Sequence, residues 1–422
     1  MRQEIKDRIE KIRNGEVPEG YANKKSGVYP DIWNEKSLKD LCSVVDYRGK
    51  TPVKTEEGIF LLTAKNVKEG KIDYQVSKEY ISSSEYEEVM RRGTPKIGDV
   101  VITTEAPLGN VAQIDNERIA IAQRVIKLRG NESIISNEYL KYFLFSDNFQ
   151  SELDKESTGS TVKGIKGSRL KKLNIVFCQI SEQQKIASIL SIWDKAIELK
   201  KQLIEQKKEQ KRGLMKKLLI GEVRLPGFDG EWKEVKLSEI AYQSTLKNTG
   251  NLDIRVLSCT KYDGLVDSLE YFGRKMFSDD ISKYKIVKKG QVCYATNHIE
   301  EGSIGIMNKF DVGLVSPMYT VFEVNSEHDS NYVFQVLKSE RYVELYKSLM
   351  SASVNRRGSL RWNEFSEIKI TCPTYEEQKS IANFINFVNY NIDLLQQELE
   401  SLKLQKKGLM QMLLTGIVRV QN

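Results

Sequence analysis

The sequence of 422 residues lacks the signatures of several protein classes. Its five cysteines are odd in number and scattered, without a Cys-x-x-Cys pair, which argues against a disulfide framework or a structural zinc site. Its two histidines, His298 and His328, have no ligand-spaced neighbours, so we expect no metal site. No run of about eighteen apolar residues is present and the N-terminus is charged throughout, so neither a membrane span nor a secretory signal is expected. These absences predict a cytoplasmic protein.

Motifs for catalysis on DNA are also missing. A base methyltransferase would need an Asn/Asp-Pro-Pro-aromatic loop, and none of the eight prolines is followed by another. Gly159 and Gly164 have the spacing of a nucleotide-binding P-loop, but Ile165 follows where that motif needs lysine. Glu105 and Glu300 follow expected strands, as nuclease carboxylates do, without a convincing second acid and lysine. We therefore expect no enzymatic activity, and a stand-alone nuclease using Glu105 or Glu300 is the alternative.

The sequence does contain a long segment that occurs twice. Residues 182–225 and 377–420 align without a gap at an offset of 195 residues. Both open with Glu-Gln-x-x-Ile-Ala, contain Gly-Leu-Met and close with Gly-x-Val-Arg, which ends at Arg224 and at Arg419. A register kept over roughly forty positions indicates an internal duplication.

A longer block precedes each of these segments. The blocks begin with Trp-x4-Leu, at Trp33 and at Trp232, and end at the Glu-Gln pairs. Each contains short β-prone runs separated by glycine, then a helical run from residue 137 or 331, then a polar Gly/Ser segment. The β-prone runs are 59–67, 98–106, 109–114 and 119–128 in the first block, and 254–262, 290–298, 302–307 and 314–324 in the second. Each block is therefore expected to be an α+β globule with a diverged middle.

Apolar residues in the repeated segments follow heptads. Helices of this length rise about 57 Å, too far to be buried against one compact domain, so we expect them to pair antiparallel. Lys200, Lys207 and Lys211 interrupt the first seam, which predicts either snorkelling stems or a wider groove that another subunit fills. The other seam residues are Ile186, Leu190, Trp193, Ile197, Ile204, Leu214 and Leu218 in the first copy, and Ile381, Ile385, Val388, Ile392, Leu395, Leu399, Leu402, Leu409 and Leu413 in the second. A coiled-coil scaffold that binds only proteins is a second alternative.

The N-terminal arm is expected to contain a short helix over residues 1–13. Ile5, Ile9 and Ile12 share one face, and Asn14-Gly15 supplies a C-cap signal. The arm is similar to the distal end of the repeated segment, so it is either a third, truncated copy or a frayed terminal helix.

The polar loops next to the expected strands favour a nucleic-acid partner. Net charge is +7 and the pI is about 8.8, a mild excess that suits a polyanion. Amide and guanidinium groups read purine edges, while hydroxyls and lysines hold phosphates. The residues expected to contact DNA are Arg48, Lys50, Thr63, Lys65, Asn66, Thr103, Thr104, Gln123, Arg124, Ser160, Thr161, Lys163, Lys166 and Arg169 in the first block, and Thr260, Lys261, Tyr262, Thr296, Asn297, His298, Asn355, Arg356, Arg357 and Arg361 in the second.

The Glu-Gln-x-x-Ile-Ala openings, the Gly-x-Val-Arg endings and the Trp-x4-Leu starts together resemble the specificity subunit of Type I restriction–modification systems. The resemblance covers essentially the whole chain. It implies an α+β fold with two similar globular target-recognition domains, joined and separated by two long antiparallel helices, and an internal pseudo-two-fold duplication. The implied boundaries are 1–30 for the N-terminal helical arm, 31–181 for target-recognition domain 1, 182–225 for conserved helical region 1, 226–376 for target-recognition domain 2 and 377–422 for conserved helical region 2.

The resemblance also implies a function. Each recognition domain would read one half of a bipartite site in double-stranded DNA, and the helices would serve as spacer and as docking surface for two modification (methyltransferase) subunits. The chain itself would hold no cofactor. S-adenosylmethionine, ATP and Mg are expected on the modification subunits and on the restriction/translocase subunits.

Overall fold

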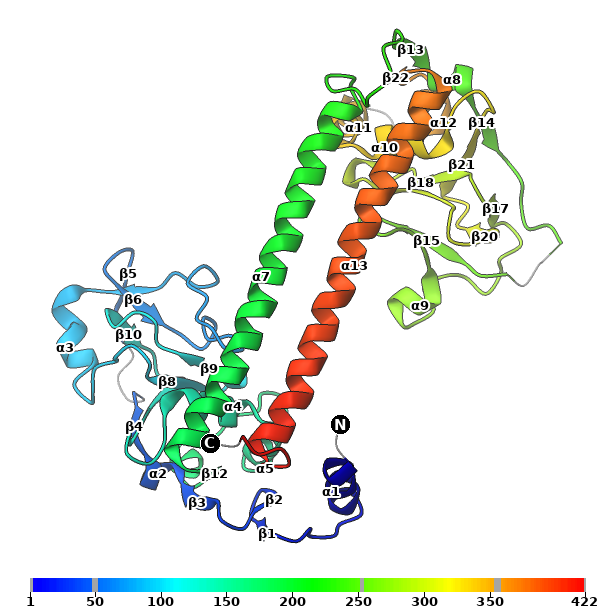
Figure 1. Cartoon of the computed structure of the whole chain (residues 1–422). Coiled ribbons are helices and arrows are strands. Elements are labelled where there is room, and N and C mark those ends of the chain that lie inside the picture. Colours follow the sequence, from blue (N-terminus) through cyan, green and yellow to red (C-terminus); the bar gives the residue numbers. More distant parts are fainter. Residues whose placement is uncertain (1–2, 48–51, 251–253, 353–357, 421–422) are drawn as a thin grey trace. The chain divides into compact units, whose positions relative to one another are not determined.

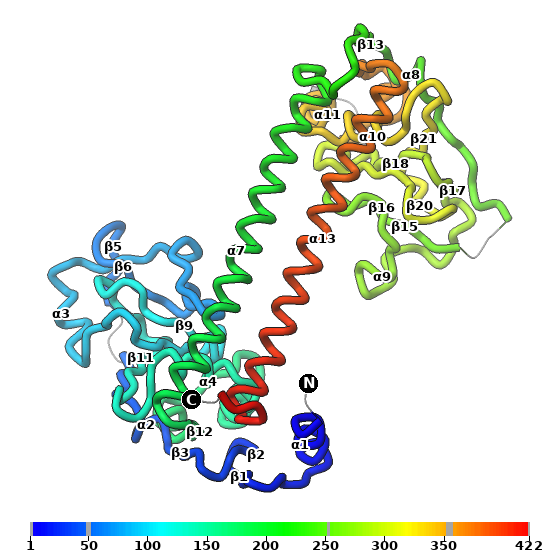
Figure 2. Tube along the Cα trace, viewed as in Figure 1, coloured from blue at the N-terminus to red at the C-terminus, as the bar shows by residue number. Residues whose placement is uncertain are grey.

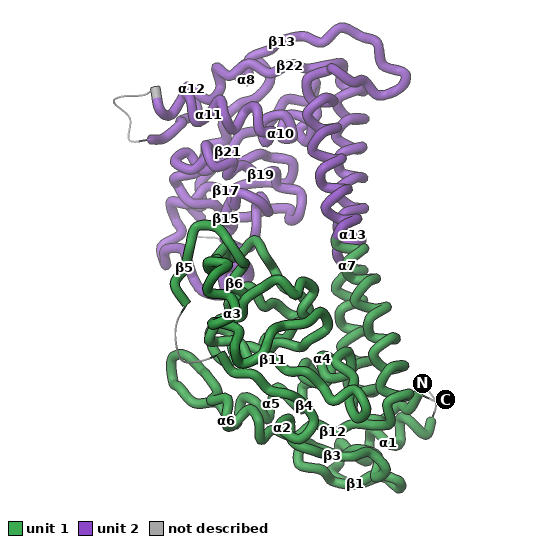
Figure 3. Tube along the Cα trace, turned by 90° about the vertical axis from the view of Figure 1, so that its left-hand side faces the viewer, with its two compact units in different colours: residues 1–201, 398–422 green, residues 202–397 purple. Residues whose placement is uncertain are grey.

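The computed structural model describes residues 3–47, 52–250, 254–352 and 358–420. The chain divides into two compact units, which are coloured separately in Figure 3. Unit 1 consists of Met1–Lys201 and Glu398–Asn422, and unit 2 consists of Gln202–Gln397. Each unit thus combines one globular block with part of each long helix.

The globular part of unit 1 is built from short strands and helices (Figure 1). Its helical elements are α1 (Gln3–Arg13), α2 (Leu38–Leu41), η1 (Ser83–Glu85), α3 (Tyr86–Val89), α4 (Asn137–Phe145), α5 (Asp147–Lys155) and α6 (Gly167–Leu170). Its strands are β1 (Tyr21–Lys24), β2 (Gly27–Pro30), β3 (Asn34–Ser37), β4 (Cys42–Asp46), β5 (Lys54–Thr55), β6 (Ile59–Leu62), β7 (Tyr80–Ile81), β8 (Val100–Thr104), β9 (Leu108–Gln113), β10 (Ile119–Ile121), β11 (Val125–Gly130) and β12 (Asn174–Phe177).

The globular part of unit 2 is also built from short strands and helices. Its helical elements are α8 (Leu237–Ile240), α9 (Ser268–Phe272), η2 (Ile299–Glu301), α10 (Ser330–Lys338), α11 (Glu340–Ala352) and α12 (Trp362–Phe365). Its strands are β13 (Lys233–Lys236), β14 (Ala241–Ser244), β15 (Leu257–Thr260), β16 (Gly264–Asp267), β17 (Lys285–Lys288), β18 (Val292–Ala295), β19 (Ile304–Ile306), β20 (Val312–Val315), β21 (Tyr319–Val324) and β22 (Lys369–Cys372).

One antiparallel sheet and one two-stranded ladder have the same topology in the two units. An antiparallel sheet has the order β4-β11-β8-β9 in unit 1 and β14-β21-β18-β19 in unit 2. A two-stranded ladder joins the start of each block to its end, β3 with β12 and β13 with β22. The predicted α+β fold and the internal duplication are confirmed by this match.

One β-prone run in each block is divided between two sheets. The β-prone runs 119–128 and 314–324 each contribute to two strands, and these strands belong to different sheets. β10 pairs in parallel with β6 while β11 pairs with β4 and β8; β20 pairs with β17 while β21 pairs with β14 and β18. The chain turns at residues 122–124 and 316–318, between the two strands of each run.

The two long helices are α7 (Ile180–Leu218, 39 residues) and α13 (Tyr375–Leu414, 40 residues), and the Cα trace in Figure 2 shows both as unbroken coils. In unit 1 the start of α7 packs with the end of α13, through residues such as Ile186 and Leu413. In unit 2 the start of α13, including Ile381, packs with Met215 near the end of α7. In both units the start of one long helix packs against the end of the other, which confirms the antiparallel pairing.

All the apolar seam residues that the heptads predicted are buried or half-buried. The interrupting lysines differ from one another. Lys200 is half-buried, with its Nζ 2.8 Å from Glu398, as a snorkelling stem would be. Lys211 is half-buried, and burial lowers the pKa of its ammonium while Asp393 opposes that shift. Lys207 is exposed.

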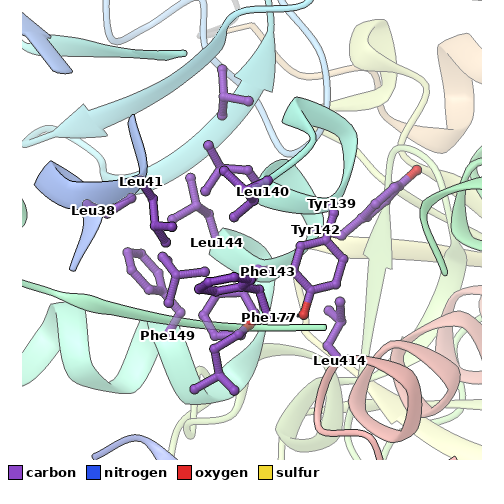
Figure 4. Packing of buried hydrophobic residues seen from close by; sticks show 14 of the residues in the cluster. Leu38, Leu41, Tyr139, Leu140, Tyr142, Phe143, Leu144, Phe149, Phe177 and Leu414 are labelled. Carbon is purple, nitrogen blue, oxygen red and sulfur yellow. Dashed lines mark hydrogen bonds between the residues drawn. The ribbon is translucent and has the colours of Figure 1, made fainter. Parts of the chain in front are cut away.

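The largest core of unit 1 joins the sheet, its covering helices and both long helices. Figure 4 shows Tyr142 and Phe143 of α4 and Phe177 of β12 packed together, with Leu414 of α13 reaching the same cluster. The end of α13 is therefore a structural part of the first block, although almost 240 residues of sequence separate it from β12. Among the described residues, no helix combines the length and apolar character needed to cross a membrane.

Candidate nucleic-acid interface

The polar residues of unit 1 gather where two parallel strands end. β6 and β10 are neighbours in parallel, with Leu62 opposite Ile121. The turns that follow them, 63–65 and 122–124, therefore emerge at the same sheet edge, the usual place for a ligand-binding crevice. They line a hollow of ≈ 290 Å³. The predicted DNA-binding residues that it brings together are Thr63, Lys65, Gln123 and Arg124.

Two cations at this hollow are already paired with carboxylates. Arg124 Nε lies 2.8 Å from Glu105, and Lys54 Nζ lies 2.8 Å from Glu79. Burial acts to raise the pKa of Glu79, but the hydrogen bond and the charge of Lys54 outweigh it and hold the pKa below its usual value. A phosphate or a base edge that binds here must compete with these carboxylates for the cations.

The predicted segment of residues 160–169 lies next to the same hollow. An isolated bridge pairs Gly164 with Glu105, the partner of Arg124. The exposed predicted residues of this segment are Ser160, Thr161, Lys163, Lys166 and Arg169. Lys163 Nζ is 2.6 Å from Asp154, so part of this positive charge is neutralised within the loop.

Three predicted contact residues have buried side chains. Asn66 is fully buried: its amide donates to the carbonyls of Asp73 and Ser77 and its oxygen accepts from Thr63. Thr103 and Thr104 lie inside β8, and the Thr103 hydroxyl accepts from the backbone N–H of Asn110. These three side chains hold the sheet edge in shape and present no surface to a base, which corrects their expected role.

In unit 2 the predicted residues lie on the turn after β15 and in the loop after β18. The hydroxyl of Thr260 accepts from the N–H of Asp263 and closes the β15–β16 turn, so that Lys261 and Tyr262 project as exposed side chains. The hydroxyl of Thr296 donates to the carbonyl of Met318, while Asn297 beside it is half-buried. This site differs in residue type from that of unit 1.

The loop after β18 is tied to the segment that leads into α12. Leu360 N donates to the carbonyl of Thr296 at 2.8 Å, which brings the exposed Arg361 toward that loop. Further residues expected to contact DNA lie outside the described residues: Arg48 and Lys50 in the first block, and Asn355, Arg356 and Arg357 in the second.

His298, Glu300 and Glu301 place one potential metal-ligand atom each within 4.8 Å of the others. His298 Nδ1 is already 3.2 Å from Glu301, and both side chains are exposed. This arrangement is equally that of an ordinary surface hydrogen bond, so no metal site is assigned to it.

A second constellation, which the sequence patterns did not reveal, ties the repeated motifs together. In unit 1 the guanidinium of Arg419 makes a bidentate pair with Glu182, at 2.6 and 2.7 Å, and lies 5.7 Å from the ring centre of Trp33. Gly416 has φ +69°, and a Cβ there would be 3.1 Å from the Trp33 ring. We call Arg419, Glu182 and Trp33 clasp 1.

Unit 2 contains the same arrangement, which we call clasp 2. Arg224 pairs with Glu377 at 2.5 and 2.6 Å and lies 5.6 Å from the ring centre of Trp232. Gly221 has φ +75° and would place a Cβ 3.2 Å from that ring. The glutamines after the two glutamates also match, because Gln183 and Gln378 each bond backbone groups of their own block.

The family model for the Type I restriction modification DNA specificity domain matches residues 30–208 and 229–404, which is more than half of the chain. The chain belongs to this family. Each match begins beside a clasp tryptophan and includes one globular block with most of the helix that follows it. The family domain is therefore present twice, in agreement with the duplicated sheet.

Curated specificity subunits of Methanocaldococcus jannaschii are similar along much of their length. The Type I restriction enzyme MjaVIII specificity subunit is 27% identical over 323 residues, which cover 72% of this chain and 75% of that protein. The putative type I restriction enzyme MjaX specificity subunit is 24% identical over 437 residues, 96% of this chain and 97% of that protein.

Solved structures share the fold. The S subunit of a Type I restriction–modification system from M. genitalium is 18% identical, with a TM-score of 0.53 over 91% of this chain and 96% of that chain. A chain from a structural study of complex assembly in a type I R-M system is 16% identical, with a TM-score of 0.58 over 92% of this chain and 99% of that chain. The architecture with two family domains and two long helices is thus that of the specificity subunits.

Proposed function

We propose that this chain is the non-catalytic DNA-specificity subunit of a Type I restriction–modification complex. The observation that carries the proposal is the presence of two copies of the family domain with different polar residues at corresponding sheet edges. Thr63, Lys65 and Arg124 mark the edge in unit 1, whereas Lys261 and Tyr262 mark it in unit 2. Two unlike edges on one chain suit the reading of two different half-sites in double-stranded DNA.

Two exposed helix faces are proposed as docking surfaces for two modification subunits. Ile192 and Leu199 on α7 are 65% and 54% exposed, and their equivalents in the repeat, Phe387 and Leu394 on α13, are 63% and 37% exposed. The members of each pair are seven residues apart, so they lie on one helix face. Large apolar residues exposed at matching places favour one kind of partner bound twice.

The chemistry of the complex is proposed to lie on the partner subunits. S-adenosylmethionine would bind the modification subunits, and ATP and Mg the restriction/translocase subunits, while this chain contributes binding and spacing. Methylation of a base needs that base to leave the stack, so the specificity subunit would hold the flanking bases while the duplex deforms. We place this activity in the cytoplasm, where these partners would meet chromosomal DNA.

The test is methylation by the assembled complex. The full chain with its modification partner and S-adenosylmethionine is expected to methylate one bipartite sequence in a randomised DNA library, and the chain alone none. Lys65→Ala combined with Arg124→Ala should weaken methylation of one half-site class, with Lys78→Ala as a surface control. Methylation or cleavage by the isolated chain would contradict the proposal.

The two alternatives predict different outcomes. A nuclease would cleave DNA with magnesium and lose this activity in Glu105→Gln; yet Glu105 is paired with Arg124, as a structural carboxylate would be. A protein-only scaffold would show no salt-dependent DNA affinity even with the partner subunits present. The comparisons give support to neither alternative.

A further inference from the structure

Each long helix is held at both ends, by a different clasp at each end. Glu182 at the start of α7 belongs to clasp 1, and the segment that follows the end of α7 contributes Arg224 to clasp 2. Glu377 at the start of α13 belongs to clasp 2, and Arg419 beyond its end belongs to clasp 1. A bidentate Arg–carboxylate pair fixes direction as well as distance, so neither helix can slide or rotate while both clasps hold.

Burial of the two glutamates disfavours any other register of the helices. The side chains of Glu377 and Glu182 are only 1% and 7% exposed. A slipped helix would leave a buried carboxylate without its cation, which proteins tolerate poorly. The guanidinium groups are partly exposed and also lie over the tryptophan rings. Each clasp therefore connects the start of its block to the helix ends.

The N-terminal arm adds a strap to clasp 1. Tyr21 donates from its hydroxyl to the carbonyl of Gly416 at 2.6 Å, although the two residues are 395 positions apart. Arg8 donates to the carbonyl of Ile417 and lies 5.0 Å from the ring centre of Tyr21. In unit 2 a short stretch of chain joins the corresponding glycine, Gly221, to Trp232. In unit 1 Gly416 and Trp33 are far apart in sequence, so the contacts of the N-terminal arm take the place of that covalent connection.

We propose that the two clasps, with the arm strapping clasp 1, are a positioning device that sets the spacer length between the two DNA half-sites. The inference rests on the proposed function. A helix advances about 1.5 Å per residue and one base pair about 3.4 Å, so a slip of two residues corresponds to about one base pair. Arg224, Arg419 and their glutamates are therefore positioning residues that touch no base.

The experiment uses the full chain with its modification partner and a library in which both half-sites are fixed and the spacer varies. The wild-type complex is expected to methylate one spacer length. Arg419→Ala should raise the methylation of neighbouring spacers relative to the preferred one by about tenfold, the effect of roughly 1.4 kcal/mol of lost discrimination. Tyr21→Phe should shift the dependence of methylation on spacer length in the same direction by a smaller factor. This variant replaces Arg419→Ala in the test if Arg419→Ala fails to fold.

Rescue separates positioning from general stability. Arg419→Lys should not restore the profile, since a lysine cannot form the fork, whereas Glu182→Arg with Arg419→Glu should restore it. Lys200→Ala, which removes an ion pair with an exposed carboxylate elsewhere on the seam, is the matched control and should keep the wild-type profile. An unchanged profile in folded Arg419→Ala, or a change in half-site sequence instead of spacer, would overturn the inference. A wild-type complex that methylates no bipartite site would refute the proposed function instead.

Discussion

Asp99 is a buried carboxylate that links strand β11 to the turn before β8. It accepts from the Arg129 guanidinium at 2.6 and 2.7 Å and from the Lys96 backbone N–H, and Lys127 Nζ lies 3.4 Å away. Asp99→Asn should lower the free energy of unfolding by about 3–5 kcal/mol, because Lys127 then remains as a buried charge without its partner. Lys127→Met should cost little, since Asp99 keeps Arg129. Urea denaturation of both variants checks this contrast, and similar losses in the two would contradict it.

The same carboxylate predicts a pH dependence. Burial acts to raise the pKa of Asp99, but the Arg129 and Lys96 hydrogen bonds and the charges of Lys127 and Arg129 hold it below its usual value. A lowered pKa in the folded state contributes stability that is fully present above the unfolded value of about 3.9 and is lost as pH falls through the folded value. The free energy of unfolding should therefore fall below about pH 4. Denaturation at several pH values measures this decrease in the free energy of unfolding with falling pH. The decrease should be smaller in Asp99→Asn.

Lys65 and Asn66 are adjacent yet should respond differently to alanine. Lys65→Ala should leave stability within about 0.5 kcal/mol, as for other exposed side chains, and reduce the salt dependence of DNA binding by the complex. Asn66→Ala removes hydrogen bonds to the turns at Thr63, Asp73 and Ser77, so it should cost about 1–3 kcal/mol of stability. Thermal unfolding and a salt titration of binding separate the two effects. Equal behaviour would show that the structural role given to Asn66 is wrong.

At the scale of elements, the helix seam gives a graded prediction. Leu399 is buried in unit 1, whereas Leu404 on the same helix is exposed. Leu399→Ala should destabilise by about 2–5 kcal/mol and Leu399→Lys by more, because the ammonium would enter the seam. Leu404→Ala is the matched control and should have little effect. Denaturation and assembly with the partner measure both, and an unaffected Leu399→Lys would count against the antiparallel pair.

Local periodicity was enough to predict the long helices, because their apolar positions recur every three or four residues over nearly forty positions. It could not separate β10 from β11, since the residues on both sides of the turn are equally β-prone and only tertiary pairing divides them. Asn66 was predicted to lie in a surface loop because its sequence neighbours are polar, and a few neighbouring residues do not determine whether a side chain is buried. The clasps escaped prediction since their partners are 237 and 153 residues apart, although the motifs that supply them were visible as repeat markers.

At the scale of the whole molecule, the duplication separates what is shared from what varies. The clasps, the end ladders and the long helices recur with matching residues, while the loops at the sheet edges differ. The shared parts are those proposed to hold register and to dock the modification subunits, and the variable parts can diverge without disturbing them. A recognition domain should therefore be exchangeable as long as its clasp residues stay in place.

Exchanging residues 240–365 for the equivalent part of another family member should change one half-site and leave the other half-site and the spacer unchanged. Clasp 2 lies outside the exchanged range, because Arg224 and Trp232 precede it and Glu377 follows it. Tyr294 and Phe365, whose ring centroids are 4.3 Å apart in the core, both lie within the exchanged range, so they are replaced together. Sequencing of methylated bases in a host that expresses the chimaera with its modification partner identifies both half-sites at once. A chimaera that alters both half-sites or the spacer would show that the blocks do not act independently.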